Sequence, residues 1–339
     1  MSDAETLGTT YGGRFRAGPR LDAMLAVPGV IAVAGLVLHA RTTLDGGPPE
    51  LIDRALLAVG GVVGLLVLAT SRDDSGVVPR SYRPAAVGAL LILLGVVADI
   101  TWAAALGTAP GIAAAIRPPA LVMALGVGLF GTAPVAGAWR RRSVPVGWDS
   151  LPVLAGTILG YATVTAATAS VHPFVELGDP AAGVPAIVVQ AALLSGVVAL
   201  LLARFEPGPG AFTVILLGSG VVAVAVGGPA VAVAAALIAG VLLDGVYLWF
   251  DPSPSRSGTF RAFAGVAAAT FGGVTLLVTA LTGSLDWPIA ATTGAVLAAG
   301  IAGWLVGYLV LTPIVPEGAT RGTIPALAGT EPSRADESD

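Results

Sequence analysis

The sequence predicts an all-α integral membrane protein with about ten transmembrane helices, arranged as two inverted five-helix repeats. The first observation is composition, because 55% of the 339 residues are hydrophobic, only 11% are charged, and the mean hydropathy is +0.87. A soluble domain has roughly 25% charged residues, which it needs to cover its exterior. The second and third observations, the spacing of apolar runs and a repeated eight-residue pattern, give the helix number and the repeat. We therefore expect the chain to contact the lipid bilayer over most of its length.

Missing residue types narrow the range of functions. The chain has no Cys and no Lys, so all 17 basic residues are Arg. This excludes disulfides, thiolate metal sites, a Walker-type phosphate loop and Schiff-base chemistry. No catalytic, cofactor or metal motif stands out, so we expect neither an enzyme nor a cofactor or metal site. The formal net charge of -4 lies mostly on the two tails and gives no indication of nucleic-acid binding.

The predicted elements follow from apolar runs bounded by Gly, Pro and charges. Residues 1–22 form a polar tail, and the run 23–40 has about the length of a bilayer crossing. A signal peptide is the alternative for this segment, but the tail is long and Leu38 is large for a cleavage site. Residues 313–339 are rich in Pro, Gly, Thr, Glu and Asp and are predicted to be disordered. The predicted transmembrane domain, 23–312, contains nine further runs: 51–70, 84–106, 118–139, 150–170, 184–204, 211–227, 229–250, 260–282 and 287–312.

The boundary at Gly227, Gly228 and Pro229 allows two interpretations. One is a two-helix hairpin, and the other is a single broken or re-entrant segment. About 40 apolar residues, at about 1.5 Å of rise each, are enough for two crossings. This length favours the hairpin.

Arginine placement predicts the orientation in the membrane. With a cytoplasmic N-terminus, fourteen Arg fall on the inside and only Arg41, Arg54 and Arg117 on the outside. This bias follows the positive-inside rule. We therefore expect a multi-pass protein of the plasma membrane with both termini in the cytoplasm. The densest charge run, residues 140–142, is interpreted as a topogenic anchor at the headgroups, with a specific anionic-lipid or partner site as the alternative.

An eight-residue pattern occurs twice and places a carboxylate in each copy. It consists of Gly, Val, two apolar residues, Asp, two more residues and a large aromatic, in residues 95–102 and again in residues 240–247. Division of the ten runs into halves of about 23–170 and 184–312 puts the pattern in the third helix of each half. Because five is an odd number, the second half is inverted in the membrane. This correspondence predicts an inverted duplication.

Asp99 and Asp244, the carboxylates of the pattern, are the candidate substrate- or proton-binding residues. Asp99 is predicted to lie toward the outside of its span and Asp244 toward the inside of its own. An ionised carboxylate at that depth costs at least about 2.5 kcal/mol, so each should face the bundle interior, a wet cavity or a partner. Because every Arg lies at a span end or beyond, we expect hydroxyl partners and a protonated carboxylate rather than a salt bridge. Gly95 and Gly240, four residues earlier on the same helix face, predict a close packing seam.

The function of these carboxylates has two interpretations. One is proton or cation binding in a symmetric transporter, and the other is interhelical hydrogen bonding that fixes the helix packing. The two histidines, His39 and His172, lie near carboxylates at span ends, which allows metal binding or pH sensing. Their wide separation favours solvated loop residues instead.

The function hypothesis is a secondary transporter or permease for a small solute, coupled to protons through Asp99 and Asp244. The alternative is a noncatalytic membrane subunit or scaffold that works with membrane protein partners. A transporter usually has several polar groups that converge near the middle of the membrane, whereas a scaffold does not need them. The scarcity of such groups in this sequence weakens the transport hypothesis.

Overall fold

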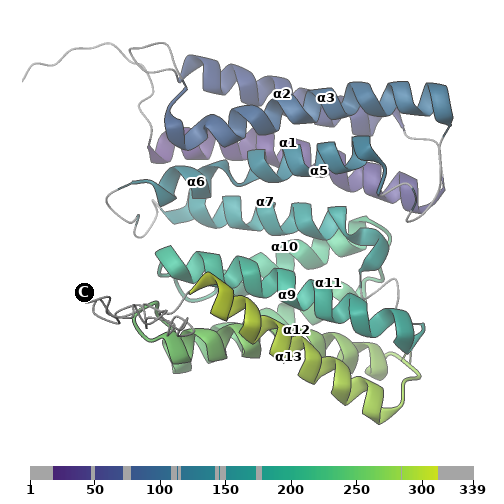
Figure 1. Ribbon diagram of the computed structural model, residues 1–339, viewed down its shortest axis with the longest axis vertical. Helices are drawn as coiled ribbons and strands as arrows, with labels where there is room; N and C mark the ends of the chain where they lie inside the picture. Colours follow the sequence, from purple (N-terminus) through teal and green to yellow (C-terminus); the bar gives the residue numbers. More distant parts are fainter. Residues whose placement is uncertain are drawn as a thin grey trace, which may run out of the picture.

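The structure, a computed structural model, is helical and contains no strand in the part of the chain that it describes (Figure 1). That part is residues 18–46, 50–71, 78–107, 116–141, 150–172, 178–283 and 285–311, with the single residues 113 and 145. In chain order the α-helices are α1 (Pro19–Leu44), α2 (Leu51–Thr70), α3 (Arg83–Leu106), α5 (Pro118–Gly131), α6 (Ala133–Trp139), α7 (Leu151–Ala167), α9 (Pro180–Arg204), α10 (Ala211–Ala225), α11 (Val231–Phe250), α12 (Ser257–Leu281) and α13 (Ile289–Val310). Two 3-10 helices, η1 (Arg80–Tyr82) and η3 (Ala169–Val171), precede α3 and follow α7.

Seven helices of the described part are long and apolar enough to cross a membrane: α1, α2, α3, α9, α11, α12 and α13. The pair α5 and α6 is an eighth candidate if it forms one span that is bent by 46°. The helices α7 and α10 are also apolar but have only 17 and 15 residues. The predicted all-α membrane protein is confirmed at this level, whereas length and composition support seven or eight crossings rather than ten.

Successive helices run in alternate directions across the bundle, except that α6 continues from α5 after the bend (Figure 1). Contacts between opposite helix ends show this directly, because the first turn of α10 meets the end of α11 and the first turn of α12 meets the residue after α13. The side on which α1 begins and α13 finishes is called the terminal end below. The other side is called the opposite end.

The helix boundaries differ from the prediction at two places. Helix α1 begins at Pro19, within the predicted tail, because Pro is well accommodated in a first turn and Asp22 in that turn is buried and paired. The predicted span 118–139 is broken at Thr132, since Pro134 lacks an N–H and its ring clashes with the preceding turn. Residues 1–17 and the predicted disordered tail 313–339 lie outside the described residues.

The hairpin predicted at Gly227 is confirmed. Helices α10 and α11 are separate and pack against each other along their length. Gly227 has a φ of 109° at the turn between them, a conformation that favours Gly. This turn reverses the chain and places the start of α10 beside the end of α11.

Two buried apolar clusters form the core, one in each half of the elongated bundle. The first cluster joins α1, α2, α3, α5 and α6, and the second joins α9, α11, α12 and α13. Helices α7 and α10 contribute side chains to both clusters and lie between the halves in Figure 1. The two halves of the bundle are therefore one continuous packing unit that is joined at α7 and α10.

Candidate functional site

A network of five ionisable side chains is buried at the opposite end of the bundle. It contains His39 near the end of α1, Asp53 and Arg54 in the first turn of α2, Asp99 near the end of α3, and Arg117 just before α5. Four of these residues are at most 6% exposed, and the Arg54 side chain is 15% exposed. Four elements therefore converge on a polar site inside an apolar bundle.

Asp99 is held by two arginines. Arg54 donates to Asp99 Oδ2 from Nε at 3.0 Å and from Nη2 at 2.7 Å. Nη2 of Arg117 lies 3.7 Å from Asp99 Oδ1. The contact with Arg54 is a two-donor, charge-assisted pair, whereas the approach of Arg117 is an ion pair without a hydrogen bond.

This pairing corrects the expectation that Asp99 has hydroxyl partners rather than a salt bridge. The nearby Thr101 hydroxyl instead donates to backbone carbonyls of its own helix. Arg54 lies 16 residues before the end of α2 at Thr70, and Asp99 lies 16 residues after the start of α3 at Arg83. An antiparallel hairpin therefore puts both at the same depth, and this count was the signal in the sequence that could have found the pair.

His39 and Asp53 form the second part of the network. His39 Nδ1 lies 3.0 Å from Asp53 Oδ2, and the Arg54 backbone N–H donates to Asp53 Oδ1 at 2.6 Å. An ionised carboxylate can only accept, so Nδ1 is the donor in this hydrogen bond and Nε2 is the second ring nitrogen. His39 Nε2 has no hydrogen-bond partner among the described residues.

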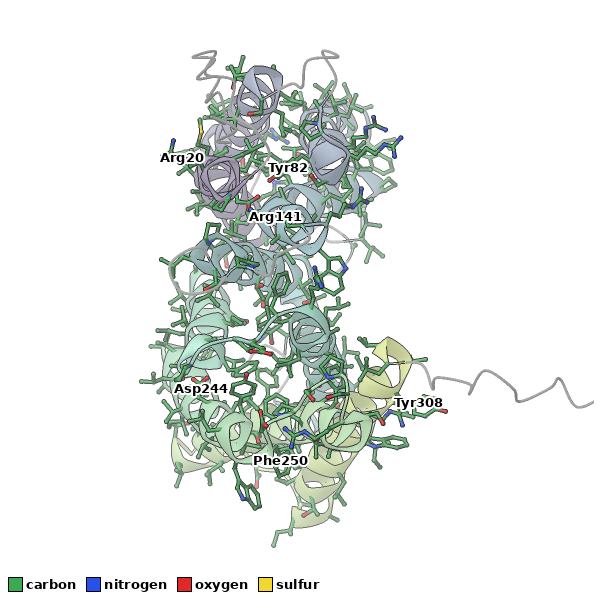
Figure 2. The ribbon with its side chains drawn as sticks, turned by 90° about the vertical axis from the view of Figure 1, so that its left-hand side faces the viewer. Arg20, Tyr82, Arg141, Asp244, Phe250 and Tyr308 are labelled. Carbon is green, nitrogen blue, oxygen red and sulfur yellow. The ribbon has the colours of Figure 1, made fainter. Side chains whose placement is uncertain are left out.

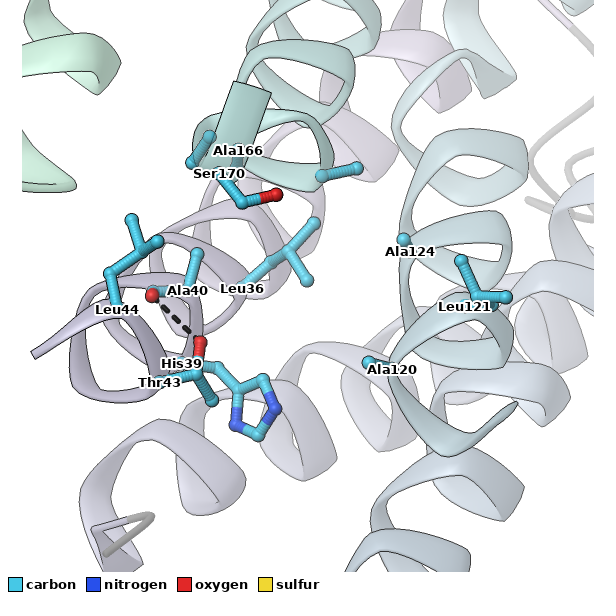
Figure 3. Close-up of a pocket in the computed structure, with 12 residues that line it drawn as sticks. Leu36, His39, Ala40, Thr43, Leu44, Ala120, Leu121, Ala124, Ala166 and Ser170 are labelled. Atoms are coloured by element: carbon cyan, nitrogen blue, oxygen red, sulfur yellow. Dashed lines mark hydrogen bonds between the residues drawn. The ribbon is translucent and has the colours of Figure 1, made fainter. Parts of the chain in front are cut away.

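A small cavity lies beside His39, between α1, α5 and the end of α7 (Figure 3). Its volume is about 40 Å³, and its lining includes Leu36, Ala120, Ala124 and Ser170. Figure 3 shows the His39 imidazole projecting from α1 toward the side of Ala120. The lining is mostly Ala and Leu, with His39, Thr43 and Ser170 as its polar members. The volume has room for a water molecule, and a water bound to these polar groups can carry a proton to the imidazole.

Asp244 belongs to a different site, at the terminal end of the bundle. Its carboxylate accepts from the backbone N–H groups of Phe212 at 3.2 Å and Thr213 at 3.0 Å, and from the Thr213 hydroxyl. These groups lie in the first turn of α10, where N–H groups have no partner within the helix. Asp244 therefore caps α10 from the neighbouring helix, and its negative charge complements the helix dipole.

The two candidate carboxylates do not meet. Asp99 lies in α3 in the upper half of Figure 1, whereas Asp244 is labelled in the lower half of Figure 2. The expected depths are consistent with this geometry, since Asp99 lies toward the opposite end and Asp244 toward the terminal end. The expectation of a close seam is also confirmed, because a Cβ at Gly95 would lie 3.0 Å from the Met123 nitrogen and one at Gly240 would lie 2.5 Å from the Thr213 Cα.

A second polar cluster, which the sequence reasoning missed, closes the terminal end of the first half. Asp22 in the first turn of α1 is buried and forms an ion pair with Arg141 at the end of α6. The Tyr82 hydroxyl donates to Asp22 Oδ1 at 2.7 Å. Figure 2 shows Tyr82 and Arg141 close together in the upper half. Arg141 therefore pairs with a carboxylate of the protein, and Arg142 of the same predicted anchor lies outside the described residues.

Both histidines are buried, so the expectation of solvated loop residues was wrong. His172, just after η3, is 4% exposed and lines a small cavity with residues of α10, α11 and α12. Burial lowers the pKa of the His172 imidazole to about 4, so the side chain is neutral near pH 7. No group of three or more potential metal-ligating His, Asp or Glu side chains occurs among the residues that the structure places.

The chain matches no model of a protein family, no curated protein and no solved structure.

Proposed function

We propose that this protein is a proton-coupled secondary transporter for a small solute, and that the network around Asp99 binds the proton. The observation that carries the proposal is the burial of five ionisable side chains beside a cavity within helices that can cross a membrane. Ionisable residues at such positions are expensive to bury, and they commonly mark proton or solute pathways.

The charge balance supports a proton-binding role. The negative charges of two carboxylates cancel the positive charges of two guanidinium groups within the network, and a neutral imidazole adds no charge. A proton that reaches His39 Nε2 through the cavity leaves one positive charge in excess. Buried excess charge is unfavourable, so protonation favours a rearrangement of α1, α2 and α5 around the site. Such a rearrangement is also needed to admit a solute, because the cavity beside His39 holds only about 40 Å³.

The topology that we propose for this transporter has ten crossings in the plasma membrane and both termini in the cytoplasm. The short helices α7 and α10 and the bent pair α5 and α6 count as full crossings in this topology. The equivalent sites of Asp99 and Asp244 support two inverted repeats. Each Asp lies near the end of the third helix of its half and contacts the first turn of the second.

Proton flux into liposomes that contain the purified protein tests the proposal. We expect Asp99→Asn and His39→Gln to reduce flux at least tenfold, because the first removes a charge of the network and the second removes the proton acceptor. Asp244→Asn is the matched control, since the oxygens of Asp244 already accept from three donors, and its flux should stay near the wild-type value. Equal flux in all three variants, each folded as judged by thermal unfolding, would exclude the proton role.

The second candidate function is a noncatalytic membrane subunit. It is favoured by the separation of Asp99 and Asp244, because two sites with different partners form no shared path. A subunit of this kind should leave native membranes, in mild detergent, as part of a complex larger than the purified chain. Extraction as a single chain would contradict the subunit hypothesis.

A further inference from the structure

An apolar groove runs between the two halves of the bundle, along α5, α6 and α7 and beside α9. Its volume is about 510 Å³, and its lining extends from Val135 and Thr157 to Ala124 and Ala167, with Leu201 on α9. The ten residue-to-residue steps from Thr157 to Ala167 correspond to about 15 Å of helix rise. Val135 and Leu201 lie toward the terminal end, whereas Ala124 and Ala167 also line the cavity beside His39. The groove therefore extends from the terminal side past the middle of the bundle.

The groove offers almost no polar contact. The three threonines in its lining, Thr132, Thr157 and Thr163, each donate their hydroxyl to a carbonyl four residues earlier in the chain. The other lining residues are mainly Ala, Gly, Leu and Val. An occupant that fits this surface is an extended apolar chain.

An arginine and a tryptophan mark the end of the groove toward the terminal end of the bundle. Val197, Leu201 and Arg204 lie at i, i+4 and i+7 on α9, so Arg204 continues the stripe that lines the groove. Trp139 lies four residues after the lining residue Val135, is half-exposed, and packs its ring edge-on against Phe205. Trp and Arg at this depth are typical of the headgroup region of a bilayer.

The guanidinium groups at this end have donors to spare. Arg204 Nη2 donates to the Arg141 carbonyl at 2.7 Å, and Asp22 pairs with Nη2 of Arg141. Nε of Arg204 and Nε and Nη1 of Arg141 are buried and have no hydrogen-bond partner within the described ranges. Glu206 is exposed two residues beyond Arg204. Buried N–H groups without an acceptor are unfavourable, and an anionic oxygen would satisfy them.

We propose that this groove binds one anionic phospholipid from the leaflet at the terminal end. An acyl chain lies along α7 between α5 and α9, and the phosphate contacts Arg204 and Arg141 beside Trp139. The apolar lining selects the chain, and the two arginines select a negatively charged headgroup over a zwitterionic one. The bound lipid fills the space between the two halves.

Thermal unfolding of the purified full-length protein in a neutral detergent tests this site. Phosphatidylglycerol and phosphatidylcholine with the same acyl chains are added in parallel titrations, together with inorganic phosphate. We expect phosphatidylglycerol to raise the unfolding temperature most. Arg204→Gln should weaken the apparent affinity for phosphatidylglycerol about tenfold, as for the loss of one charge-assisted hydrogen bond.

A second variant tests the groove without touching a charge. A Cβ at Gly128 would meet only the Thr163 methyl group, at 3.8 Å, so Gly128→Leu fits the backbone and fills the groove. We expect it to lose the stabilisation by phosphatidylglycerol. Gly245→Leu, on an exposed face where an added Cβ meets nothing within 4 Å, should retain it.

Three results would overturn the proposal. The first is an equal shift with phosphatidylcholine, and the second is an unchanged response in Gly128→Leu. The third is full stabilisation by inorganic phosphate alone, which would assign the arginines to a free anion rather than to a lipid.

Discussion

Asp99 connects α3 to α2 and to the start of α5 through two ion pairs. Its carboxylate contacts Arg54 from α2 and Arg117 from the start of α5, and it is fully buried. Removal of one partner of a buried ion pair leaves an uncompensated charge, which costs about 3 to 5 kcal/mol. Asp99 is therefore a stability determinant, whatever its part in proton transfer.

A double-mutant cycle of Asp99→Asn and Arg54→Gln tests this role. We expect Asp99→Asn alone to destabilise the protein by about 3 kcal/mol. The double variant should lose much less than the sum of the two single variants, because neither partner then remains as an unpaired charge. Thermal unfolding of the four proteins gives the coupling, and strict additivity would contradict the ion pair.

His172 predicts a dependence of stability on pH. Its pKa is about 4 in the folded protein, against an ordinary value of 6.5. The unfolded chain therefore binds the additional proton between these values, so stability falls as pH drops from about 6.5 to 4 and is unaffected by this group above that window. The loss is on the order of 3 kcal/mol.

His172→Gln is the variant that checks this dependence. Unfolding temperatures at pH 7.5 and pH 4.5 should differ less in the variant than in the wild-type protein. A wild-type protein whose stability does not change over this range would contradict the assignment.

At the scale of elements, the hairpin of α10 and α11 combines a glycine contact with a cap. Gly240 lets the two backbones approach, and Asp244, one turn later, accepts from the first turn of α10. The sequence predicted the close approach from the i, i+4 spacing of Gly and Asp. It did not identify the partner, because nothing in the Asp pattern distinguishes a capping contact from a salt bridge.

Gly240→Ala should disturb this hairpin. The added Cβ would lie 2.5 Å from the Thr213 Cα, which is backbone and cannot rotate away. Overpacking of this kind costs about 1 to 3 kcal/mol. Thermal unfolding should show the loss, whereas Gly245→Ala on the same helix, with open space around it, should be neutral or slightly stabilising. Equal stability of the two variants would contradict the seam.

The helices were predicted accurately in the long apolar runs and less accurately where tertiary packing determines a helix boundary or a break. All ten runs coincide with helices, and seven of these helices are long and apolar enough to cross a membrane. The break at Thr132 depends on how α5 and α6 pack, and the early start of α1 depends on Tyr82 and Arg141, which are distant in sequence. The local sequence pattern contains neither the packing of α5 and α6 nor these distant contacts.

At the scale of the whole molecule, arginine distribution gives the clearest prediction. The described arginines at the terminal end are Arg20, Arg80, Arg83, Arg140, Arg141, Arg204, Arg256 and Arg261, whereas Arg41, Arg54 and Arg117 lie at the opposite end. Arg54 and Arg117 both contact Asp99. The apparent exceptions to the positive-inside rule are thus partly neutralised, which strengthens the proposed orientation.

Single cysteines test this orientation directly, because the native chain has none. Asp45→Cys lies at the opposite end and Glu206→Cys at the terminal end, and both positions are exposed. A membrane-impermeant maleimide should label Asp45→Cys in intact cells and Glu206→Cys only after permeabilisation. The reverse pattern would invert the proposed topology.

The resemblance between the two halves is clearest in the equivalent positions of Asp99 and Asp244 and is limited elsewhere. Helix α1 packs closely on α2, whereas α10, the corresponding second helix of the other half, packs on α7 across the centre. The repeated pattern in the sequence therefore predicted a local contact better than a global arrangement.

The short helices α7 and α10 have a consequence for the surrounding membrane. Their 17 and 15 residues reach only about 25 and 22 Å, against a hydrocarbon core of about 30 Å. Both lie in the middle of the elongated bundle, between longer helices (Figure 1). In the proposed topology with ten crossings, hydrophobic mismatch at these two helices is relieved by a locally thinner bilayer or by water that enters at the helix ends. The protein should therefore deform the membrane most at its centre, and the deformation should grow with lipid chain length.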